Sequence, residues 1–123
     1  MDLVEFLKSL EPEELQFISR RDYGEDAETH LASLLGVVES GGGFREDQYW
    51  HPYEVVELGA HSLVPGHQRE FAACTLLVIA AVRSGFDTST DLAGKFADRA
   101  ADYDKLDPAL RESVLAAYAS AGL

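Results

Sequence analysis

The chain has 123 residues, which is enough for one domain that buries its own core without a disulfide or a structural metal. Hydrophobic residues make up 46% and charged residues 26% of the sequence, a balance that excludes intrinsic disorder. The net charge of -12 at pH 7 would repel nucleic acids and anionic membranes, so we expect neither as a partner.

Three helices are predicted before the glycine run at residues 41–43. The first covers about residues 3–10, because four apolar side chains share one face: Leu3, Phe6, Leu7 and Leu10. The second begins at Pro12, a position in the first turn where proline is tolerated, and ends at about Arg21. The third begins at Glu25 or Asp26 and ends at the glycines, and its apolar stripe consists of Leu31, Leu34, Leu35 and Val38.

The segment after these glycines combines acids with aromatic residues. Three consecutive glycines, residues 41–43, cost backbone entropy, so we expect the residues after them, 44–50, to form a mobile surface connection. Tyrosine and tryptophan often anchor protein interfaces, and this stretch places Tyr49, Trp50 and Tyr53 beside Glu46 and Asp47. The alternative is that Trp50 and Tyr53 pack as a staple onto the helix that starts at Pro52.

The second half predicts further helices. One starts at Pro52 with Val55 and Leu58 facing inward, and the next, about residues 67–84, is apolar nearly all round and should lie at the centre. Two more follow, with inward residues Leu92, Phe96, Ala100 and Tyr103 in one and Leu110, Val114, Leu115 and Tyr118 in the other. We therefore predict an all-α fold, a single domain over residues 1–123 that forms a compact orthogonal bundle of six or seven helices.

Cys74 is the only cysteine, which excludes an intrachain disulfide, and it lies in the apolar run 71–82, where we expect it to serve packing. That run is too short to cross a bilayer. The N-terminal sequence MDLVEFLK carries acids where a secretory signal would carry positive charge, so we expect a cytoplasmic protein. Since no motif of nucleophilic catalysis occurs, we predict no catalytic residue and no cofactor.

Metal binding is an alternative interpretation of the helix that starts at Pro52. Helical spacing places Glu54, Glu57 and His61 on one face, where His51 or His67 could complete a ligand set. The motif His-Glu-x-x-His is absent, and a solvated helix face explains the same residues more simply. Residues 87–98 begin like a calcium loop, but the sixth position is Leu92 instead of glycine, which favours helix capping.

Negative charge is concentrated in the first half of the chain. Residues 1–62 contain 14 acidic and 4 basic residues, a net charge of -10, whereas residues 63–123 have a net charge of -2. Such a field attracts a basic protein surface and speeds its association. We therefore expect a basic protein partner, with a toxin domain as one candidate, bound by the acidic N-terminal half and the loop 41–53. The residues expected to make contact are Glu46, Asp47, Tyr49, Trp50, Tyr53, Glu54 and Glu57.

In size, acidity, single helical domain and lack of a catalytic motif, the chain resembles the cytoplasmic immunity proteins of bacterial toxin systems. The resemblance implies inhibitory binding of a toxin domain and assigns no role to any residue. Two alternatives stay open: a small metal-binding enzyme or sensor that uses Glu54, Glu57 and His61 with His51, and a self-associating adaptor. The second alternative comes from the alanine-rich last helix, whose small side chains permit close helix approach in a homo-oligomer.

Overall fold

The computed structural model describes residues 3–18, 27–41, 43–44, 52–56, 67–85 and 100–120. Within these ranges every regular element is a helix, which confirms the predicted all-α fold. The helices are α1 (Leu3–Lys8), α2 (Pro12–Ile18), α3 (Ala27–Ser40), α5 (Gln68–Arg83), α7 (Ala100–Tyr103) and α8 (Pro108–Ser120), and residues 52–56 form a further helical turn. Among these described helices, none combines the length and the hydropathy that spanning a membrane requires.

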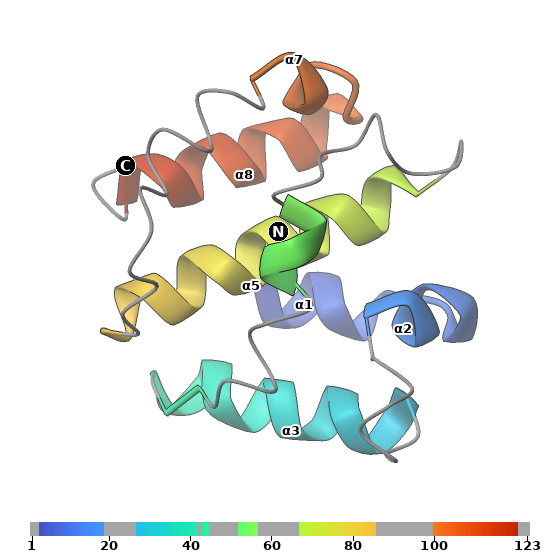
Figure 1. Ribbon diagram of the computed structural model, residues 1–123, viewed down its shortest axis with the longest axis vertical. Coiled ribbons are helices and arrows are strands. Elements are labelled where there is room, and N and C mark those ends of the chain that lie inside the picture. The colour runs from blue at the N-terminus through green and yellow to red at the C-terminus, as the bar shows by residue number, and fades with distance from the viewer. Residues whose placement is uncertain are drawn as a thin grey trace.

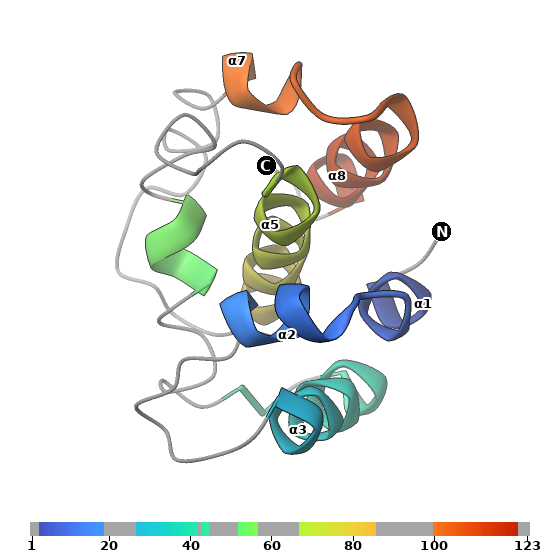
Figure 2. The same cartoon turned by 90° about the vertical axis from the view of Figure 1, so that its right-hand side faces the viewer.

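The helices are arranged in layers around α5 (Figure 1). On one side of α5 lie α7 and α8, and on the other side lie α1 and α2, with α3 beyond them; Figure 2 shows the same order after a quarter turn. The contacts agree with this order, because α5 contacts α1, α2 and α8, and α3 contacts α1 and α2. We refer to α1, α2 and α3 as the N-terminal helices.

The central helix was predicted over about residues 67–84, and the structure confirms it as α5, Gln68–Arg83. Every side chain from Phe71 to Ile79 is buried, because the sequence is apolar or small on all faces of the helix there, and the carboxyl of Glu70 just before this run is buried as well. The one buried hydroxyl in its middle, Thr75 Oγ1, donates to the carbonyl of Phe71 at 2.9 Å. The helix ends at Arg83, and Gly85 two residues beyond has a φ of 90°, which lies in the left-handed region that glycine adopts without strain.

The predicted apolar faces of the N-terminal helices point inward. Phe6 and Leu7 of α1 and Leu34 of α3 are fully buried in the core, with Leu35 and Val38 packed against it. At the start of α2, the Oε1 atom of Glu14 accepts the backbone N–H of Glu11 at 2.8 Å and so satisfies an N–H group at the helix terminus. The predicted end of this helix near Arg21 lies outside the described residues.

Helix α8 faces the core with Leu110, Val114 and Tyr118, as predicted, but Leu115 is 44% exposed. The prediction for Leu115 was wrong because consecutive residues of a helix are turned by about 100° from one another. The inward face of α8 follows a spacing of four residues from Leu110, and Leu115 falls outside it. Among the described residues, Leu115 is the one large hydrophobic side chain that is exposed.

Aromatic rings connect the central helix to the C-terminal helices. The rings of Phe71 in α5 and Tyr103 in α7 are stacked with centroids 5.3 Å apart, and Tyr103 meets Tyr118 of α8 edge-on at 5.5 Å. Burial is the main cause that raises the pKa of Tyr118 above its ordinary value, so this phenol stays neutral. The aromatic contacts hold the four-residue helix α7 against the core.

Candidate functional site

Most of the predicted partner-binding residues fall outside the described part of the chain: Glu46, Asp47, Tyr49, Trp50 and Glu57. The two described members lie on the helical turn 52–56. Glu54 is half-buried, whereas Tyr53 is only 7% exposed and belongs to the hydrophobic core. The prediction of Tyr53 as a contact residue is therefore corrected, because its side chain is packed in the core.

Of the candidate metal ligands, only Glu54 and His67 are described, because His51, Glu57 and His61 lie outside the described residues, as do residues 87–98. Among the side chains that are described, no three His, Cys, Asp or Glu residues lie close enough together to hold a metal ion. The thiol of Cys74 is buried, and burial raises its pKa above the ordinary value, with the charge of Glu70 acting in the same direction. Such a thiol is a packing group and a poor nucleophile.

A cluster of polar side chains joins α1 and α2 to the start of α5. This polar cluster consists of Ser9, Glu14, His67, Arg69 and Glu70. Arg69 Nε donates to Oε2 of Glu14 at 2.8 Å, and Arg69 Nη2 donates to the carbonyl and Oγ of Ser9 at 3.3 and 3.2 Å. The guanidinium also lies 5.4 Å from the ring centroid of Phe6, within reach of a cation–π interaction. One arginine of α5 thus contacts both α1 and α2.

Glu70 is the most deeply buried charged residue of the polar cluster, with 3% of its surface exposed. Its carboxyl group lies beside that of Glu14, and two carboxyl groups can share a hydrogen bond only when one of them carries a proton. Its Oε2 lies 3.5 Å from Nδ1 of His67, and the two atoms form no hydrogen bond. The His67 ring in turn meets the ring of Phe17 edge-on with centroids 4.8 Å apart.

The environment separates the pKa values of the two carboxyl groups. Burial, followed by the hydrogen bond and the charge of Glu14, raises the pKa of Glu70 from 4.5 to about 7. Burial acts in the same direction on Glu14, but the hydrogen bonds from the Glu11 backbone, Glu70 and Arg69 outweigh it and lower the pKa of Glu14. Glu70 therefore holds the shared proton.

An acid with a pKa near neutrality can serve as a general acid or base when substrate reaches it. Glu70 has almost no exposed surface and lies against Glu14 of α2. The protonation of Glu70 therefore affects how α5 packs against α2. The polar cluster was not predicted from the sequence, because Ser9 and Glu14 are separated from Arg69 by 60 and 55 residues. The local signal at Glu14 was only that of an acid in the first turn of a helix.

Exposed carboxylates dominate the described surface of the N-terminal helices and the short connection between them. The exposed acids there are Glu5, Glu11, Glu13 and Glu39, whereas Lys8 is the one exposed base that the structure describes in this part. On α7, α8 and the connection between them, the difference is smaller, since the exposed acids Asp104, Asp107 and Glu112 are accompanied by the exposed bases Lys105 and Arg111. Two ion pairs form there: Arg111 Nη2 lies 2.7 Å from Asp104, and Lys105 Nζ lies 3.6 Å from Asp102. The charge asymmetry of the sequence is therefore also present on the described surface.

Comparisons of this chain with models of protein families, with curated proteins and with solved structures found no match. Its function is therefore inferred from its own residues. Two features bear on that inference: the acidic surface of the N-terminal helices and the buried position of the polar cluster.

Proposed function

We propose that the protein is a stoichiometric binding protein of the immunity type, which neutralises a basic protein partner through its acidic half and the segment 41–53. The observation that carries this proposal is the excess of exposed carboxylates on the N-terminal helices, where four acids accompany one described base. A surface of one sign raises the rate at which a partner of opposite sign associates and favours the correct orientation.

The proposal assigns different tasks to the two parts of this surface. Glu5, Glu13 and Glu39 supply the field on three helices that pack against one another, so the charges keep their relative positions when a partner approaches. Contact residues come from the adjoining segment and turn, where acids would bind lysine or arginine and rings would fill pockets. They are Glu46, Asp47, Tyr49, Trp50, Glu54 and Glu57, while Tyr53 supports the turn from the core side.

The first experiment is co-purification at low ionic strength with the product of the neighbouring gene, because immunity proteins are expected beside their toxins. We expect a complex of equal stoichiometry and rescue of cells from the toxicity of that product. The absence of both complex and rescue would count decisively against the proposal.

A matched pair of charge reversals tests the role of the acidic surface. Glu13→Lys changes an exposed residue of α2, and Glu112→Lys makes the same change in net charge on α8. We expect Glu13→Lys to slow association with the partner about three- to tenfold at low ionic strength. The effect should become smaller as salt is added. Glu112→Lys serves as the control and should change the rate much less. Equal effects of both variants would show that net charge alone, and not the N-terminal helices, directs the encounter.

A further inference from the structure

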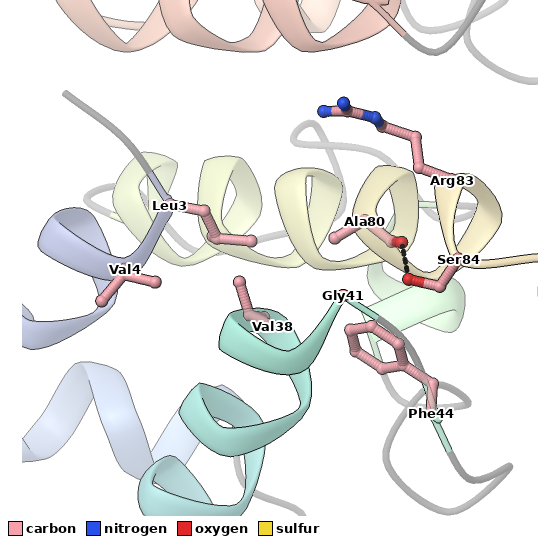
Figure 3. Close-up of a pocket in the computed structure, with 8 residues that line it drawn as sticks. All are labelled: Leu3, Val4, Val38, Gly41, Phe44, Ala80, Arg83 and Ser84. Carbon is pink, nitrogen blue, oxygen red and sulfur yellow. Dashed lines mark hydrogen bonds between the residues drawn. The ribbon is translucent and has the colours of Figure 1, made fainter.

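A pocket of about 400 Å³ lies between α1 and the C-terminal ends of α3 and α5 (Figure 3). Leu3 of α1 and Val38 of α3 face Ala80 of α5 across it, and the ring of Phe44 closes the side next to the end of α3. The volume is in the range of pockets that hold small ligands, and five of the eight described lining residues have apolar side chains.

A second pocket of about 230 Å³ continues the apolar surface toward α8. Its lining includes Leu76 and Ile79 of α5 and Ala117 of α8, and it shares three residues with the first pocket: Leu3, Ala80 and Arg83. The two pockets adjoin each other along the C-terminal half of α5, and we refer to them together as the α5 groove.

Arg83 is the one charged residue in the described lining of the α5 groove. It is exposed and makes no hydrogen bond or ion pair with the part of the chain that the structure describes. The hydroxyl groups of Ser84 and Ser113 donate to the carbonyls of Ala80 and Ala109, so they are already engaged within their own helices. A cation in the last turn complements the helix dipole, which explains arginine at this place but not the apolar walls beside it.

The charge of this groove is opposite to that of the chain as a whole. The protein has 22 acidic and 10 basic residues, yet no carboxylate lines the described part of the α5 groove. A groove whose described lining combines apolar side chains with one arginine is complementary to a ligand with an apolar body and one anionic end. The guanidinium can bind a carboxylate through two parallel hydrogen bonds, and the walls can remove an aliphatic chain from water.

We propose that the α5 groove binds a linear aliphatic carboxylate of the medium-chain fatty acid class. The chain lies against Leu3, Val38 and Ala80, and the carboxylate binds Arg83. Binding through this groove uses residues of α1, α3, α5 and α8 that lie outside the segment 41–53, apart from the border at Gly41 and Phe44.

Three ligands with the same chain and different ends test the proposal by calorimetry on the full-length protein: decanoate, decanol and decylamine, each below its micelle-forming concentration. We expect decanoate to bind about tenfold more tightly than decanol, because its ionised end adds charge-assisted hydrogen bonds to Arg83. Decylamine should bind most weakly. No binding of decanoate, or equal binding of decanoate and decanol, would overturn the proposal.

Two protein variants locate the site. Arg83→Gln should reduce the affinity for decanoate about tenfold, to that of decanol, whereas Arg111→Gln removes the same charge from an arginine outside the groove and should change nothing. Val38→Trp fills the first pocket and should weaken both decanoate and decanol binding, with circular dichroism confirming that the variant is folded. An Arg83→Gln protein that still prefers decanoate, or a folded Val38→Trp protein with unchanged affinities, would contradict the proposed site.

Discussion

Glu70→Gln removes an ionisable group from the polar cluster while it keeps the shape of the side chain and its ability to donate a hydrogen bond to Glu14. In the folded protein the pKa of Glu70 is raised from 4.5 to about 7, mainly because the carboxyl is buried and further because of Glu14. The folded state thus binds this proton more tightly than the unfolded state. The resulting stability is fully present below about pH 4.5 and is lost as the pH rises through about 7.

The magnitude follows from the difference between the two pKa values, which corresponds to about 3 kcal/mol in the free energy of unfolding. Most of this difference, about 2–3 kcal/mol, develops between pH 5 and pH 8. Because glutamine cannot ionise, we expect the Glu70→Gln protein to be similar to the wild type at pH 5 and more stable than the wild type at pH 8. Urea denaturation followed by circular dichroism at a series of pH values measures the difference.

Glu13→Gln is the matched control, because it makes the same chemical change at an exposed residue of the same helix that contributes Glu14. Both variants remove one carboxylate, so the general repulsion within this acidic chain cancels when they are compared. The Glu13→Gln curve should run parallel to that of the wild type. If the Glu70→Gln curve is parallel to the wild type as well, then Glu70 does not hold a proton at neutral pH and the reasoning about the polar cluster fails.

Three further predictions concern the fold and are all measured by urea denaturation. Val114→Ala should reduce the free energy of unfolding by about 2 kcal/mol, whereas Leu115→Ala, on the exposed side of α8, should change it by less than about 0.5 kcal/mol; similar costs would refute the orientation of this helix. Gly36→Ala, in the interior of α3, should add about 0.5–1 kcal/mol, but Gly85→Ala should cost about 1–2 kcal/mol, because both sites have room for a methyl group and only Gly85 has a positive φ. Arg69→Met takes the guanidinium away from two carboxylates and should cost about 1–2 kcal/mol, with a larger cost at pH 8 than at pH 5; a cost that does not change with pH would contradict the geometry of the polar cluster.

The helical elements could be predicted because their signals are local. Pro12 and Pro108 open helices, Gly85 closes one, and the continuous apolar run from Phe71 identifies the central helix before any contact is known. The error at Leu115 shows the limit of such signals, since an apolar residue at the edge of a helix stripe can face the core or the solvent. Packing against α5 decides between the two.

The sequence by itself determined the all-α class, the place of the central helix, the acidity of the first half and the packing role of Cys74, because each depends on composition or on neighbours within a few residues. Only the tertiary structure decided which distant residues meet. It brings Arg69 to Glu14 across 55 residues, and it brings Leu3, Val38 and Arg83 around one groove. The physical reason is that these contacts form only when α5 packs between two layers of helices. A local sequence pattern predicts that a helix has an apolar face, but not which face of another helix it will contact.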